Sequence, residues 1–180
     1  MNELELIRAQ LAAERAHLAA VVDAVAATFD AQPAPEGALG EFRQACVDYL
    51  VCVLAWYEER DRRLAQLLQR RAPGDATRAA LDEALARHGG SRDALGKLEA
   101  ALAGGSPAAW REFAQFFHGV WSTRRDALEA LLAADARVGD WRALGGIDAD
   151  IILEERSRYA RVRAMAPAGV ALAAEVPPAR

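Results

Sequence analysis

The sequence has few of the residues that favour β-strands: Val, Ile and Thr are scattered along its 180 residues and form no alternating runs. In their place it has 43 Ala and 21 Arg, which are among the best helix formers. A composition of 53% hydrophobic and 27% charged residues is typical of a globular protein. We therefore expect an all-α chain whose length fits one domain.

Lysine is almost absent, since Lys97 is the only one in the chain. The excess of Arg over Lys, together with the abundant Ala, indicates the codon usage of a GC-rich genome. The net charge of −4 offers no general basic surface for the phosphates of nucleic acid. The chain has no uncharged apolar run of 18 residues, and its N-terminus lacks the basic-then-apolar layout of a signal peptide. We expect a cytoplasmic protein that binds neither nucleic acid nor membranes.

Cysteine is also scarce. Cys46 and Cys52 are six positions apart on one predicted helix, a spacing that separates their side chains too far for a disulfide. Both lie in the most apolar stretch of the chain, where a thiol is unreactive. No Gly-x-Ser-x-Gly sequence or phosphate-binding loop is present. These observations favour a protein that is not an enzyme.

Apolar residues at spacings of three and four predict a series of helices separated by short Gly- and Pro-containing links. The predicted segments are 2–31, 38–71, 75–103, 107–137 and 148–165. Gly89 and Gly90 interrupt the third segment, which is either one kinked helix or a helical hairpin. Ser106 is the predicted N-cap of the next helix, with Pro107 at its first position.

Four long segments with short links predict an up-down-up-down four-helix bundle with an extra C-terminal helix. Residues 1–165 would form this single domain, and residues 166–180 a flexible C-terminal tail. Between Ala45 and Tyr57 the second helix is apolar nearly all round, with Asp48 as its sole charge. Such a helix is covered on more than one side. The cover would be either the final helix or a second subunit.

Four polar residues interrupt the apolar stripes at similar heights. In an up-down-up-down bundle with a rise of 1.5 Å per residue, each lies about 16–18 Å from the shared end. These residues are Glu14, Arg60, His88 and Arg124. One interpretation is a structural ion-pair network that sets the helix register. The other is a binding site for a small anionic ligand, because two guanidiniums can grip a carboxylate or phosphate in a bidentate manner.

A metal site has weaker support. Glu14 and His17 form a single Glu-x-x-His pair, whereas a di-iron carboxylate bundle needs two such pairs and further carboxylates. The chain has no zinc-ligand spacing of His and Cys residues. We therefore predict no metal and no cofactor.

Two stretches resemble the regulator of sigma D family, which comprises bacterial anti-sigma helical bundles. They are Phe42-Arg43-Gln44-Ala45-Cys46-Val47-Asp48-Tyr49-Leu50, continuing to Tyr57-Glu58-Glu59-Arg60, and Trp110-Arg111-Glu112-Phe113-Ala114-Gln115. The Val47-Asp48-Tyr49 start is also similar to that of hemerythrin-like bundles. Leu54 stands where both patterns carry His, which argues against a hemerythrin-type di-iron site. The resemblance implies a helical bundle and assigns no functional residues.

The leading functional hypothesis is a non-enzymatic bundle that acts through protein–protein interaction, as a regulator or as a homodimer. Its best contact surface for an acidic partner is the arginine-rich segment 156–163. One alternative is a bundle that binds a small anion, or acts on it as an enzyme, through Glu14, Arg60, His88 and Arg124. The other alternative is a hemerythrin-like metal-binding bundle.

Overall fold

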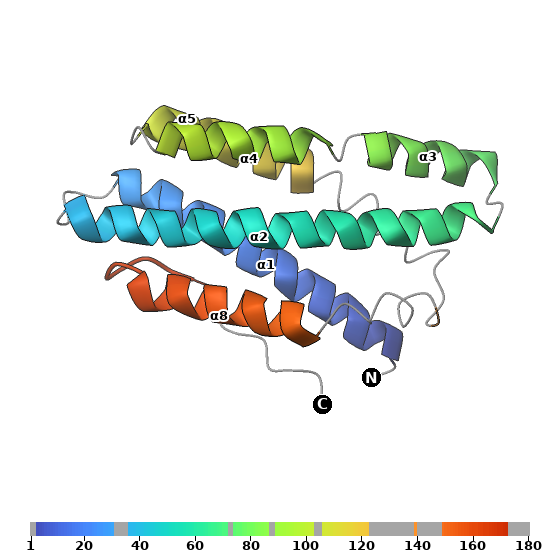
Figure 1. The fold of residues 1–180 in the computed structure, drawn as a ribbon, viewed down its shortest axis with the longest axis horizontal. Coiled ribbons are helices and arrows are strands. Elements are labelled where there is room, and N and C mark those ends of the chain that lie inside the picture. Colours follow the sequence, from blue (N-terminus) through green and yellow to red (C-terminus); the bar gives the residue numbers. More distant parts are fainter. Residues whose placement is uncertain are drawn as a thin grey trace.

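The computed structural model describes residues 3–30, 36–71, 74–86, 89–102, 106–122, 139 and 149–172. Within these ranges the chain forms helices and no β-strand (Figure 1). The elements are α1 (Glu3–Asp30), α2 (Glu36–Gln69), α3 (Asp75–Ala86), α4 (Gly89–Leu102), α5 (Pro107–Phe116), the π-helical segment η1 (Phe117–Ser122) and α8 (Ala149–Met165). The prediction of an all-α chain is thus confirmed for the described residues.

Local sequence signals account for several of these helix ends. Ser106 is the N-cap of α5, where its side chain accepts a hydrogen bond from the backbone N–H of Ala109, and Pro107 occupies the first turn. Both features were predicted. α3 and α4 follow one another along the same side of α2 and do not fold back as a hairpin (Figure 1). The helix predicted over 107–137 is described only as far as Ser122, so the four-helix up-down arrangement stays a prediction.

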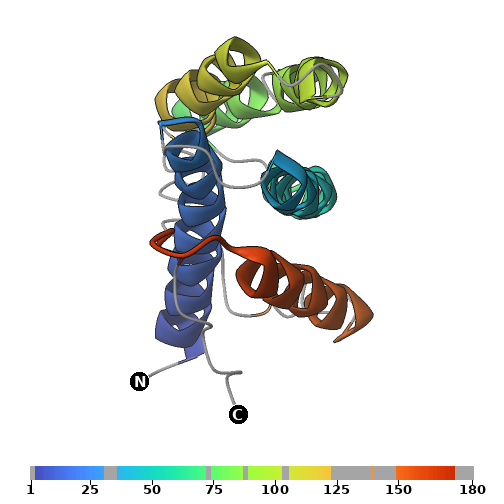
Figure 2. The same ribbon diagram turned by 90° about the vertical axis from the view of Figure 1, so that its left-hand side faces the viewer.

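α2 lies at the centre of the described structure. It packs against α8 on one side, against α3 and α4 on another, and against α1 (Figures 1 and 2). α5 packs against both α4 and α1. The largest fully buried side chains include Phe42, Tyr49, Leu50, Leu54, Trp110, Phe117 and Tyr159. The core therefore joins α1, α2, α5 and α8 into one packed unit.

The apolar centre of α2 is covered by the final helix. Val47 and Leu54 are both buried, and α8 contributes the buried side chains of Tyr159 and Val162 to the same core. The prediction was that either the final helix or a second subunit covers this stretch, and in the structure α8 packs against it. Val51 and Trp56 stay half-buried, and a second subunit stays a prediction.

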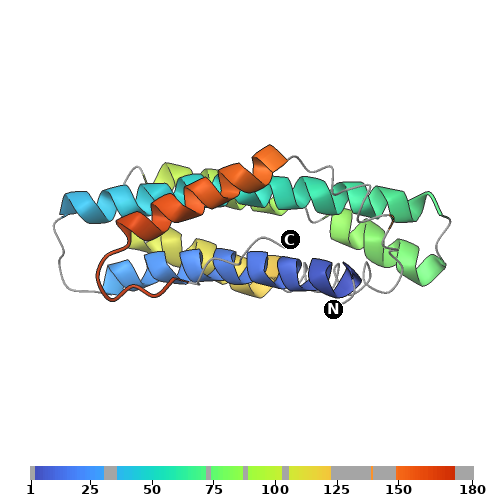
Figure 3. The same ribbon diagram turned by 90° about the horizontal axis from the view of Figure 1, so that it is seen from below.

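The segment after α8 remains packed as far as Leu172. Gly169 adopts a φ of 88°, beside a turn in which the N–H of Val170 donates to the carbonyl of Pro167. This turn carries the chain back over α1 (Figures 2 and 3), and Val170 and Leu172 are half-buried against the core. These apolar side chains gain cover by packing, and the domain boundary at residue 166 stays a prediction. The rest of the predicted tail lies outside the described residues.

None of the helices in the described ranges combines the length and the hydropathy that a membrane span requires.

Candidate functional site

Glu14 and Arg60, two of the four residues predicted to share a polar layer, meet between α1 and α2. Arg60 Nη1 donates a hydrogen bond to Glu14 Oε2 at 2.8 Å, and both side chains are about 10% exposed. The guanidinium of Arg60 also lies 4.7 Å from the centre of the Tyr57 ring. Water screens this pair little, so its two charges interact more strongly than those of an exposed pair.

The other two predicted layer residues, His88 and Arg124, lie outside the described residues. The structure therefore brings together Glu14 and Arg60 in one ion pair. An anion site that uses all four residues stays a prediction.

A second polar cluster joins α8 to α1 and α2. The hydroxyl of Tyr49 donates to Glu155 Oε1 at 3.2 Å, and His17 Nδ1 lies 3.9 Å from the same oxygen. The ring of His17 stacks on Tyr159, with centroids 4.4 Å apart and planes 14° from parallel. Burial, followed by the neighbouring Tyr57 and Glu155, raises the pKa of Tyr49, so its hydroxyl stays protonated and donates.

This cluster was not predicted from the sequence. His17 stood out there only as half of a Glu-x-x-His pair, and Tyr49, Glu155 and Tyr159 were not predicted as site residues. A signal was present, because Glu155, Tyr159 and Val162 recur at helical spacing and define the inner face of α8. Among the described residues, no group of three or more His, Cys, Asp and Glu side chains is arranged to hold a metal ion.

Arg158 makes a further polar contact between α8 and α2. Its Nη1 donates to the backbone carbonyl of Asp48 at 3.4 Å, while its Nη2 donates to Glu154 Oε1 at 2.8 Å. Together with the Tyr49–Glu155 hydrogen bond, these contacts favour one register of α8 on α2. α8 is therefore held by specific polar contacts as well as by apolar packing.

The opposite side of α8 carries an exposed line of residues, which we call the outer face of α8. It consists of Leu153, Ser157, Ala160 and Ala164, spaced four, three and four residues apart. Leu153 is 62% exposed, a high value for a large apolar side chain. α8 lies on the outside of the described structure (Figure 3). Arg156, Arg161 and Arg163 flank this line.

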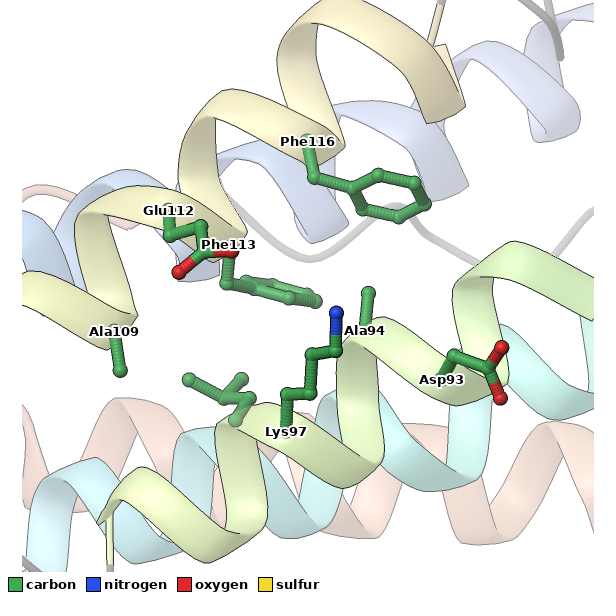
Figure 4. A pocket seen from close by; sticks show the side chains of 8 residues that line it. Asp93, Ala94, Lys97, Ala109, Glu112, Phe113 and Phe116 are labelled. Atoms are coloured by element: carbon green, nitrogen blue, oxygen red, sulfur yellow. The ribbon is translucent and has the colours of Figure 1, made fainter.

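A pocket of about 540 Å³ opens between α4 and α5 (Figure 4). Its lining combines apolar side chains with three charged ones. The lining residues are Asp93, Ala94, Lys97, Leu98, Ala109, Glu112, Phe113 and Phe116. We call it the α4–α5 pocket.

The two cysteines differ in environment. Burial raises the pKa of the Cys46 thiol far above its usual value. Burial also raises the pKa of Cys52, but this thiol is partly exposed and the nearby Arg158 opposes the rise. Both thiols are free, as the sequence predicted.

We expect a thiol-specific reagent at pH 8 to modify Cys52 at least about tenfold faster than Cys46 in the folded protein, since thiolate formation and access both favour Cys52. The measurement is the reaction rate of Cys46→Ala and Cys52→Ser variants, each of which retains one thiol. In denaturant the two rates should converge. Equal rates in the folded state would contradict the burial of Cys46.

Comparison with known proteins returns no match: no protein-family model, no curated protein and no solved structure is similar to this chain. The resemblances to anti-sigma and hemerythrin-like bundles rest on the residues quoted for them.

Proposed function

We propose that this chain is a non-enzymatic helical-bundle protein, with the up-down-up-down arrangement expected from its sequence, that acts by binding another protein. The outer face of α8 is the contact surface, and the partner contributes an acidic amphipathic helix. The observation that carries this proposal is the exposed Leu153 at the head of a line of small side chains.

The spacing of the outer face suits a second helix. Positions separated by four, three and four residues form a continuous seam of the kind that a partner helix meets along its length. Ser157, Ala160 and Ala164 have short side chains, which allow the two helix axes to approach closely. Leu153 supplies the apolar anchor that would be removed from water on binding.

The charges that flank the outer face select the partner. Arg156, Arg161 and Arg163 flank the outer face, and the exposed Glu154 is paired with Arg158, although the whole chain has a net charge of −4. A local basic surface on an acidic protein attracts and orients an acidic partner. A parallel contact between the α8 helices of two copies would place arginines against arginines, which disfavours that arrangement.

α8 is held against α2 by polar contacts within the chain. Tyr49 holds Glu155, and the Asp48 carbonyl accepts a hydrogen bond from Arg158. A surface held in this way loses little conformational freedom on binding, and this strengthens association.

The test uses two designed helical peptides with the same Leu and Ala seam, one with Glu and the other with Lys at the flanking positions. Fluorescence anisotropy of each labelled peptide is measured against the purified protein at low and high salt. We expect the Glu peptide to bind and to weaken as salt rises, because salt screens the contacts with arginine. The Lys peptide should bind at least about tenfold more weakly, since it places like charges together.

Two variants and a control locate the binding. Leu153→Ala should weaken binding of the Glu peptide roughly tenfold through lost apolar burial. Arg161→Glu should also weaken binding of the Glu peptide, and this effect should be larger at low salt than at high salt. Arg111→Glu makes the same charge change at an exposed position of α5 and should leave the affinity unchanged. Equal binding of the two peptides, or no effect of Leu153→Ala, would refute the proposal.

A further inference from the structure

The α4–α5 pocket has the dimensions and the lining of a small-molecule site. Its volume of about 540 Å³ lies within the range of about 300–1,000 Å³ that is usual for ligand pockets. Leu98 and Phe113 are buried, and Phe116 is half-buried beside them. This side of the pocket presents an apolar floor with two aromatic rings, on which a flat apolar group can pack.

Lys97 gives this floor a charged group. It is the only lysine in the chain, and its ammonium points toward the space between the rings of Phe113 and Phe116 (Figure 4). Among the described residues, no carboxylate lies within 4.0 Å of this ammonium. The pocket thus contains a positive charge that has no ion-pair partner there.

Two carboxylates limit how much negative charge the pocket accepts. Asp93 and Glu112 are exposed and lie on either side of Lys97 (Figure 4). A ligand with a single negative charge can be neutralised by the ammonium, whereas a doubly charged phosphate would be repelled by both carboxylates. A cationic ligand placed on the rings would meet the ammonium itself.

We propose that the α4–α5 pocket binds a small monocarboxylic acid with an apolar, aromatic body. The carboxylate pairs with Lys97, and the body packs on Phe113 and Phe116. This site lies on different helices from the outer face of α8, so the inference does not depend on the proposed protein partner.

The single lysine makes the contact directly measurable. An amine-reactive ester modifies Lys97 and the α-amino group of the polypeptide, and mass spectrometry reports the two rates separately. The probes are 3-phenylpropanoate, 3-phenylpropan-1-ol and 3-phenylpropylamine, which share one body and differ in the head group. At an acid concentration about ten times its Kd, we expect the modification of Lys97 to slow about tenfold. The α-amino rate should not change.

The alcohol and the amine test the role of charge. At the same concentrations we expect each to slow the modification of Lys97 less than about twofold, because neither offers an anion to the ammonium. Equal protection by all three probes would show that the pocket recognises only the apolar body and would overturn the proposal. Stronger protection by the amine, or no protection by the acid up to its solubility limit, would overturn it as well.

Calorimetry of variants measures separately how the carboxylate and the apolar body of the ligand contribute to affinity. Lys97→Met should remove the preference for the acid over the alcohol, and Lys97→Arg should retain it. Phe116→Ala should weaken binding of the acid about tenfold through lost ring contact. Leu153→Ala, an apolar truncation on α8, is the matched control and should bind the acid as the unmodified protein does. A Lys97→Met protein that still prefers the acid would contradict the assignment.

Discussion

Replacing Trp110 with Ala is expected to lower the free energy of unfolding by about 3–5 kcal/mol. The Trp110 side chain is completely buried, and its ring lies 5.7 Å from that of Phe113. Its indole N–H donates to the backbone carbonyl of Val22 at 3.2 Å and so links α5 to α1. Removing the side chain leaves a cavity where α1 and α5 pack together, and neighbouring side chains can fill such a cavity only in part.

Denaturant unfolding followed by helical circular dichroism measures this loss. Trp110→Phe keeps an aromatic ring but lacks the indole N–H, so we expect a smaller loss of about 1–2 kcal/mol. Leu153→Ala is the control, because an exposed side chain should change stability by less than about 0.5 kcal/mol. A Trp110→Ala protein within about 1 kcal/mol of the unmodified protein would show that Trp110 does not join α5 to α1.

Breaking the Glu14–Arg60 pair from one side is expected to cost about 3–5 kcal/mol, because it takes away the hydrogen-bonded partner of a charge that has little exposure to water. Arg60→Met is the informative change, since Met retains much of the length and apolar volume of the Arg stem. In the double variant Glu14→Leu/Arg60→Met neither charge remains. We therefore expect the double variant to be more stable than Arg60→Met alone.

The exposed pair formed by Glu59 and Arg62 is the matched control. Its Nη2–Oε1 distance is 2.7 Å, but both side chains are more than 40% exposed. Hydrogen bonds from Arg62 and Arg63 lower the pKa of Glu59 to about 2 from its usual 4.5. Its stabilising contribution is therefore present above pH 4.5 and is lost as the pH falls toward 2. Arg62→Met should lower the free energy of unfolding far less than Arg60→Met does at neutral pH, because solvent screens this pair.

Unfolding curves at pH 7 for the single and double variants show whether the loss of stability comes from the broken ion pair or from lost packing. If Arg60→Met and the double variant are equally destabilised, the loss of stability arises from lost packing around Arg60. The Glu14 carboxylate that Arg60→Met leaves without Arg60 then contributes nothing to that loss. A large effect of Arg62→Met would show that burial is not what distinguishes the two pairs.

Several local features could be predicted because they depend on neighbours in the sequence. The ends of α1 and α2 follow from the limits of their apolar stripes. The Ser106 cap follows from the chemistry of one turn. The proximity of Glu14 and Arg60 follows from counting residues along two adjacent antiparallel helices, since the rise per residue is constant.

Other contacts could not be predicted, because helical periodicity shows which face of a helix is apolar but not which face it meets. Tyr49 and Glu155 are separated by 106 positions, and their hydrogen bond depends on where α8 packs on α2. The same docking decides that Val47 is covered by α8 and that Leu153 stays exposed. No spacing within either helix carries that information.

The sequence by itself determined that the described part of this protein is helical, and it placed Glu14 and Arg60 at a similar height among four candidate residues. Those properties depend on backbone geometry and on the burial of apolar stripes, which act over a few turns. The tertiary structure alone decided what covers α2, which face of α8 remains free, and that Lys97 points into a pocket between α4 and α5. These outcomes depend on side chains from distant segments packing together, and that packing is a property of the whole fold.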